Sequence, residues 1–236
     1  MTSTALTIRR SDERGHARHG WLDSFHTFSF ADYHDPDHMG FRSLRVINED
    51  RVVPGRGFPT HPHRDMEIFS YVLHGRLQHE DSLGNGRVLR AGEVQVMSAG
   101  RGVRHSEFNP SKNEEVHFLQ IWIEPHTKGL TPRYTEWKPA PGSDLEKKLL
   151  VISADGREDS ATIAQDADVF RLRLKAGEAV VHDLRPGRGL WLQVMRGLVD
   201  AQGHGLSAGD GGRTEKAGPF EVTAVADTEA LLFDLG

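Results

Sequence analysis

Four side chains in two short motifs carry the chemistry that a metal ion requires. His61 and His63 stand in Thr-His-Pro-His, and His105 and Glu107 stand in Arg-His-Ser-Glu. Each pair is spaced i, i+2, so both side chains of a pair point to the same face of an extended strand. Two such strands inside a small barrel could direct three imidazoles and one carboxylate to a single point. This donor set suits a borderline divalent ion such as Fe, Mn, Co, Ni, Cu or Zn.

The other histidines and the absence of cysteine limit the kinds of site that the chain can build. The chain has 14 histidines and no cysteine, so a bound metal must be held by nitrogen and oxygen donors. His26, His34 and His38 lack paired spacing, and we interpret them as loop or hydrogen-bonding residues. A single His-x-His pair arises easily by chance in so histidine-rich a chain. A second element, His-x-Glu, about forty residues later favours a metal site over surface or core histidines.

Composition and charge exclude several classes of protein. The 236 residues include 29 Lys and Arg and 34 Asp and Glu, a net charge of −5 with histidine neutral, which argues against direct nucleic-acid binding. No apolar stretch of signal-peptide length follows the N-terminal charges. No apolar run approaches the ~18 to 20 residues of a membrane span. We therefore expect a soluble cytoplasmic protein, a monomer without membrane contact.

Turn residues and alternating apolar residues predict an all-β fold with few short helices. The chain contains 25 glycines and 11 prolines, and it is long enough for one large or two small domains. Apolar stretches of strand length occur at 44–48, 67–73, 93–97 and 118–123. Gly84-Asn85-Gly86 predicts a hairpin, because Asn and Gly tolerate positive φ.

A proline-rich segment divides the chain into two halves. Residues 126–150 contain three prolines, and because proline removes amide donors, we expect this connector to run outside the sheets. Within it, Ser143-Asp-Leu-Glu146 matches a helix capping box and predicts one or two helical turns. The sequence thus predicts an N-terminal domain at 1–125 and a C-terminal domain at 151–236, with tail strands able to cross between them.

The second half repeats the first imperfectly, without its ligands. Three pairs of segments are alike: 190–197 and 67–75, 206–210 and 89–93, 230–235 and 118–123. Similarity at a half-chain period suggests two copies of one β unit. The second copy has only the isolated His182 and His204, so we expect one metal per chain.

The first half resembles the cupin superfamily, and within it the pirin branch. Gly55-x5-His61-x-His63-x3-Glu67, followed by Gly75, nearly fits the first cupin motif, with one extra residue before the last glycine. The second cupin motif fits in part, because Val103 stands where that family has its histidine. The variant Met97-Ser-Ala-Gly-Arg-Gly-Val-Arg-His105-Ser-Glu107 is similar to the pirin motif. Flanking segments that also match lie at residues 20–33, 44–48, 61–67 and 120–123.

This resemblance implies a bicupin, two β-sandwich barrels with one mononuclear metal in the N-terminal barrel. It implies that His61, His63, His105 and Glu107 are the ligands, whereas ordinary cupins would use Glu67. Spacing alone leaves both carboxylates open, since Glu67 is i+4 from His63 and can share its face. The pirin-like motif favours Glu107, with Glu67 as a nearby hydrogen-bonding carboxylate.

The resemblance also implies an activity. Bacterial pirin-like proteins resemble quercetinases, which implies a metal-dependent dioxygenase, with iron the first candidate, that inserts O2 into the central ring of a flavonol and releases carbon monoxide. Glu107 could accept the substrate proton, with Glu67 as its rival. Phe28, Phe58 or Trp122 could line an apolar slot for the flat aromatic, although core packing explains each equally well.

An alternative is a regulatory protein. Eukaryotic pirins are associated with transcription factors, and some bacterial members with metabolic enzymes, which implies metal-sensitive protein–protein contacts. A metal-stabilised fold without activity is the third interpretation. Oxygen uptake on addition of a flavonol would separate the first two.

Overall fold

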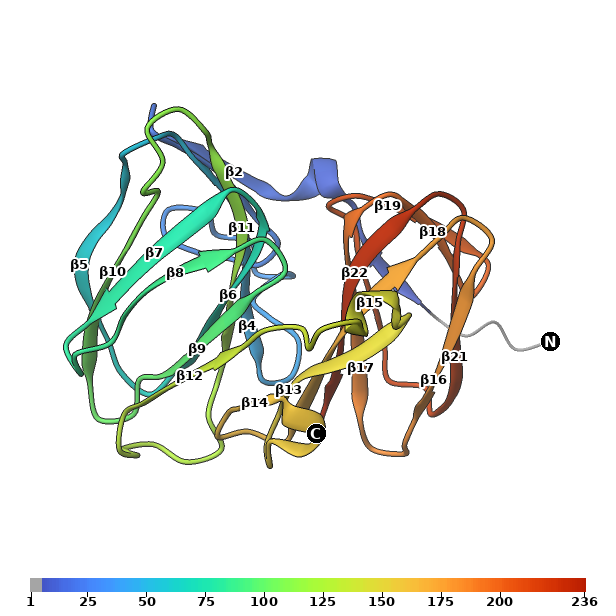
Figure 1. The fold of residues 1–236 in the computed structure, drawn as a ribbon. Helices are drawn as coiled ribbons and strands as arrows, with labels where there is room; N and C mark the ends of the chain where they lie inside the picture. The colour runs from blue at the N-terminus through green and yellow to red at the C-terminus, as the bar shows by residue number, and fades with distance from the viewer. Residues whose placement is uncertain (1–5) are drawn as a thin grey trace. The chain divides into compact units, whose positions relative to one another are not determined.

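The computed structural model describes residues 6–236, and almost every regular element in them is a β-strand (Figure 1). The chain divides into two compact units. The N-terminal unit comprises residues 15–139 and 161–165, and the C-terminal unit comprises, of the described residues, 6–14, 140–160 and 166–236. No helix within residues 6–236 is long and apolar enough to cross a membrane.

The N-terminal unit is a sandwich of two antiparallel sheets. One sheet has the order β12-β9-β6-β11-β4-β3-β2, and the other has the order β5-β10-β7-β8. The strands of this unit are β2 (Gly15–Arg18), β3 (Leu22–His26), β4 (Leu44–Val52), β5 (Gly57–His63), β6 (Glu67–His74), β7 (Arg76–Asp81), β8 (Gly86–Arg90), β9 (Val94–Ser98), β10 (Val103–Phe108), β11 (Val116–Ile123), β12 (Arg133–Trp137) and β14 (Ala161–Thr162).

The C-terminal unit has the same strand order. Its larger sheet runs β1-β20-β17-β22-β15-β13 over the strands of this unit, and its smaller sheet runs β16-β21-β18-β19. Its elements are β1 (Thr7–Arg9), β13 (Lys148–Ser153), β15 (Ala167–Leu174), β16 (Ala179–Leu184), β17 (Gly189–Arg196), β18 (Leu198–Ala201), β19 (His204–Ser207), β20 (Gly211–Thr214), β21 (Gly218–Ala224), β22 (Thr228–Leu235) and the 3-10 helices η1 (Ser11–Glu13), η2 (Ser143–Leu145) and η3 (Arg157–Asp159). The all-β fold and the two-copy architecture are therefore confirmed.

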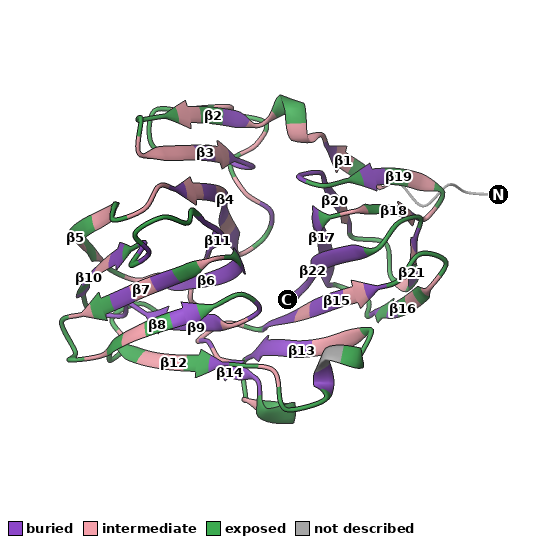
Figure 2. Cartoon of the chain, turned by 45° about the horizontal axis from the view of Figure 1, so that its top comes forward, coloured by how far each residue is buried: buried purple, intermediate pink, exposed green. Residues whose placement is uncertain are grey.

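The two units fill their interiors differently. In the C-terminal unit, buried side chains from both sheets form an apolar cluster that includes Leu172, Leu192, Val222 and Leu232. In the N-terminal unit, the apolar clusters are smaller, and Figure 2 shows buried stretches along β6, β7 and β9. Polar side chains occupy the remaining interior, and they build the site described below.

The connector differs from the sequence expectation, because part of it enters a sheet. β12 pairs antiparallel with β9 as an edge strand, with Glu136 opposite Gln95. Prolines stand before and after this strand but not inside it, so no ladder hydrogen bond is lost. The predicted helical turn is a 3-10 turn, and its N-cap is Gly142 at φ 89° rather than Ser143. The chain then enters β13 at Lys148 instead of continuing as a helix.

Candidate metal centre

Strands β5 and β10 bring three of the predicted residues together. They pair antiparallel, with His105 opposite His61, and His63 lies two residues along the same face of β5. The ligand nitrogens of His61, His63 and His105 all lie within 4.8 Å of one another. The Nε2 atoms of His61 and His105 are 3.1 Å apart. Two nitrogens bound at about 2.1 Å and at right angles on one ion lie about 3.0 Å apart, so this spacing fits a shared metal.

The protonation of these imidazoles also fits metal binding. Burial, with His105 and His61 alongside, lowers the pKa of His63 to about 3. Burial, with His61 and His79 alongside, lowers the pKa of His105 to about 3. The His61 Nδ1–H donates to the Pro59 carbonyl at 2.8 Å, which leaves its Nε2 lone pair available. The His63 Nε2 is buried and has no hydrogen-bond partner within the described chain, as expected of a nitrogen that is arranged for an ion.

Glu107 lies beside His105, held by neutral hydrogen-bond donors. Alternation along β10 places its carboxylate on the same inward face as His105, where the residue is 1% exposed. Ser70 Oγ donates to its Oε1 at 2.7 Å, and Gln95 Nε2 donates to the same oxygen at 2.9 Å. Gln120 Nε2 donates to Oε2 at 3.1 Å. Hydrogen bonds of this kind hold a carboxylate in one position.

His79 is a member of this cluster that sequence reasoning missed. It lies on β7 opposite Glu107, is fully buried, and forms a second close group with His105 and Glu107. Its Nδ1 is 3.4 Å from the Nδ1 of His105, and its ring stacks on Tyr134. His79 therefore fixes the orientation of the His105 ring from the side away from His61. The alternation of Leu77, His79 and Asp81 was the available signal.

Glu67 lies outside both groups of close ligand atoms in residues 6–236. It is 1% exposed, and Ser98 Oγ donates to its Oε2 at 2.5 Å. Burial raises its pKa, although the Ser98 hydroxyl opposes this shift. Glu67 lies three residues before Ser70 on β6, and side chains an odd number of residues apart on a strand point to opposite faces. Because Ser70 faces Glu107, Glu67 points to the other face of the sheet. Asp65, at φ 50°, turns the chain between β5 and β6. His63 and Glu67 therefore lie on different strands, and their i+4 spacing does not place them on one face.

A pocket of about 650 Å³ opens in the same unit. Phe58 lines it, as the sequence suggested, whereas Trp122 contacts His63 with a centroid distance of 4.9 Å. Phe28 is 1% exposed and is not part of the lining, so it packs in the core.

Comparisons with known proteins agree on one family. A family model described as Pirin matches residues 7–123, and a model described as the quercetinase C-terminal cupin domain matches residues 150–235. The chain is 48% identical over 230 residues to a quercetin 2,3-dioxygenase of Escherichia coli (strain K12), covering 98% of both chains.

Solved structures give the same result. The crystal structure of YhhW from Escherichia coli superposes with a TM-score of 0.95 at 48% identity, covering 98% of this chain and 97% of that chain. The bacterial pirin YhhW in complex with nickel(II) superposes with a TM-score of 0.93 at 48% identity, covering 98% of both chains.

Proposed function

This chain belongs to the pirin family of cupin proteins, and from this premise we propose that it is a metal-dependent dioxygenase that acts on a flavonol-like aromatic. The observation that carries the proposal is the convergence of three imidazoles, with the Nε2 of His63 buried and unpartnered within the described residues. The relatives named quercetin 2,3-dioxygenase support the substrate class.

We propose that His61, His63, His105 and Glu107 hold one divalent transition metal. Three nitrogen donors and one carboxylate suit iron, our first candidate, and also Mn, Co, Ni, Cu or Zn. The nickel(II) complex of the Escherichia coli pirin YhhW supports a divalent ion in this chain. In this assignment Glu107 would be the fourth ligand. Its carboxylate groups closely with His105 and His79 but not with His61 and His63, so it would have to exchange a hydrogen bond for the ion, while His79 keeps His105 aligned.

Glu107 is the candidate base, with Glu67 as the rival. When bound, the ion supplies a Lewis acid that makes a flavonol hydroxyl more acidic. Glu107 would accept the released proton, because its carboxylate lies close to His105, one of the three converging histidines. Ser70, Gln95 and Gln120 keep this carboxylate from rotating away. The overall reaction inserts both atoms of O2 into the central ring and releases carbon monoxide.

Oxygen uptake tests this proposal. Protein reconstituted with Fe, Mn or Ni should consume O2 and release carbon monoxide when quercetin is added. Uptake should vanish with chelator and in His63→Ala, but persist in His34→Ala, which removes an exposed loop histidine. Uptake that survives in His63→Ala would indicate non-enzymatic oxidation. No turnover with any metal would favour the regulatory protein that acts through metal-sensitive protein contacts.

We also propose that the protein is a cytoplasmic monomer that binds no nucleic acid. The net charge of −5 supports the last point, since non-specific nucleic-acid binding requires a basic surface. Sedimentation at several concentrations, with and without DNA, would test both the monomer and the absence of DNA binding.

A further inference from the structure

A row of polar side chains crosses the interior face of the larger N-terminal sheet. Cross-strand pairing places five buried residues side by side: Gln95, Ser70, Gln120, Asn48 and His26. Glu107 occupies one end of this row, because it accepts hydrogen bonds from the first three. The other end, Asn48 and His26, lines the 650 Å³ pocket. The row therefore joins the candidate metal centre to that pocket.

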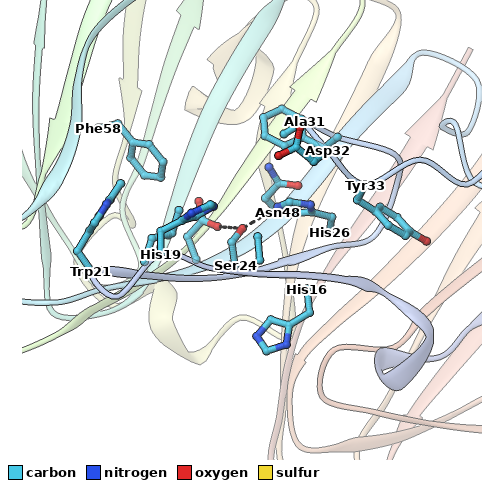
Figure 3. Close-up of a pocket in the computed structure, with 14 residues that line it drawn as sticks. His16, His19, Trp21, Ser24, His26, Ala31, Asp32, Tyr33, Asn48 and Phe58 are labelled. Atoms are coloured by element: carbon cyan, nitrogen blue, oxygen red, sulfur yellow. Dashed lines mark hydrogen bonds between the residues drawn. The ribbon is translucent and has the colours of Figure 1, made fainter.

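The pocket has aromatic walls and a polar floor. Trp21 and Phe58 pack edge to face with a centroid distance of 5.2 Å, and Figure 3 shows them together at one end, with Asn48 and His26 between them and Tyr33. On the floor, Ser24 Oγ donates to Asp50 Oδ1 at 2.5 Å.

His26 extends this chain of hydrogen bonds. Because the Ser24 hydroxyl donates to Asp50, its oxygen can accept from the His26 Nε2–H, and the two atoms are 3.0 Å apart. Aromatic walls over polar groups are typical of sites for small aromatic ligands that carry hydroxyl groups.

Asn48 supplies the observation that points to a ligand. The residue is 2% exposed, and its Oδ1 has no hydrogen-bond partner within residues 6–236. A buried acceptor without a donor is costly, and a ligand hydroxyl would remove that cost. Asp50 stands beside it on β4, two residues along the same face, so a second hydroxyl would find an acceptor there.

Aromatic contacts connect the pocket with the histidines. Phe30 lines the pocket and packs edge to face on Trp122 with a centroid distance of 5.3 Å. Trp122 in turn packs on His63 at 4.9 Å. The contacts of Phe30 with Trp122 and of Trp122 with His63 therefore link the pocket wall to the candidate ligand His63.

We propose that this pocket binds a flat polyphenol through its ring hydroxyl groups, with Asn48 and Asp50 as acceptors and Trp21, Phe30 and Phe58 packed on the rings. The inference rests on the proposed function, because this polyphenol is the substrate of that reaction. It adds the residues that select polyhydroxylated rings. A site built to bind hydroxyl groups rejects analogues that lack them, since its buried acceptors are then left unpaired.

Binding of the polyphenol measured without O2 tests this inference independently of the proposed reaction. Quenching of tryptophan fluorescence in the full chain, without O2, gives the affinity for quercetin and for 3-hydroxyflavone, which lacks the other ring hydroxyls. Wild-type protein should bind quercetin more tightly, by about tenfold or more. This preference should disappear in Asn48→Leu and shrink in Asp50→Asn, which keeps the shape of the side chain and an acceptor for Ser24.

Two control variants locate the effect. Asp37→Asn changes an exposed carboxylate in the loop after β3, and Arg104→Ala changes a separate pocket beside His63. Both should keep the wild-type preference. Unchanged preference in both Asn48→Leu and Asp50→Asn would overturn the inference, and Asp50→Asn alone decides it if Asn48→Leu does not fold. Selective anaerobic binding without any turnover would instead refute the proposed reaction and leave the pocket assignment standing.

Discussion

At the scale of single residues, the two glutamates of the motif have different surroundings. Glu107 shares a close group with His105 and His79, whereas Glu67 bonds Ser98 on the other face of β6. We predict that Glu107→Gln lowers metal retention more than Glu67→Gln does. Loss of a direct metal–ligand bond should lower metal affinity by more than the about ten- to hundredfold that is typical when a group that only hydrogen-bonds a ligand is removed. Metal content after dialysis against a weak chelator measures this, and a Glu67 variant that alone purifies without metal would reverse the assignment.

Asp50 should make stability depend on pH. Burial, opposed by the Ser24 hydroxyl and assisted by Glu107 and Glu49, raises the pKa of Asp50 to about 7. The folded protein then keeps this proton up to about pH 7, while an unfolded chain loses it near pH 4. The stability associated with the protonated form is therefore present below about pH 4 and is lost as pH rises to about 7.

The variant Asp50→Asn isolates this contribution. Relative to wild type, its free energy of unfolding should rise between pH 4 and 7, by at most about 1.4 kcal/mol per pH unit, and then level off. Urea denaturation at pH 5 and pH 8 measures the difference. Parallel pH profiles for the two proteins would contradict a raised pKa at this position.

At the scale of elements, the pairing of β5 with β10 is what places His61 opposite His105. Gly57 begins this pairing, and a Cβ there would overlap the Glu107 carbonyl oxygen and the Phe108 Cα. We predict that Gly57→Ala destabilises the fold by about 1–3 kcal/mol and weakens metal binding, because the strands must separate. Gly86→Ala is the matched control, since its nearest neighbour would lie at 3.8 Å. Equal melting temperatures and metal contents would refute this.

Sequence reasoning succeeded where the information was local to one strand. His61 with His63, and His105 with Glu107, follow from alternation along a strand. Alternation with Leu77 and Asp81 could have placed His79 on an inward face, but its position beside Glu107, like the role of Asn48, depends on the register between strands. Gln95 and Gln120 did carry a signal, as single polar residues inside otherwise apolar strands. The strand at β12 was missed because the prolines around it were taken to exclude the whole segment from the sheets.

At the scale of the whole molecule, the two units share one strand topology but enclose different kinds of interior. Both units repeat the same strand order, but the C-terminal unit fills its interior with an apolar cluster. His182, isolated in the sequence, bonds Asp234 and Lys148 there. In the N-terminal unit, polar residues on β4, β6, β9 and β11 replace apolar ones at interior positions. The same strand pairing can therefore enclose either an apolar core or a polar site, depending only on the side chains at the interior positions.

The sequence-based domain boundary at residue 125 remains a prediction, and the strand pairing suggests a sharper experiment. A fragment of residues 1–125 contains β1, whose partner β20 is absent, and lacks β12, which covers the edge of β9. It also loses Tyr134, on which His79 stacks. A fragment of residues 15–139 keeps β12 and omits β1.

We predict that the fragment of residues 15–139 is the more soluble, unfolds more cooperatively and retains more metal. The fragment of residues 1–125 leaves the edge of β9 uncovered, which favours aggregation. It also leaves His79 without Tyr134, which weakens the support of the metal ligand His105. Denaturation curves and metal analysis of the two fragments measure this. A soluble, metal-loaded and cooperatively unfolding fragment of residues 1–125 would show that β12 contributes little, and that the metal centre depends only on the strands from β2 to β11.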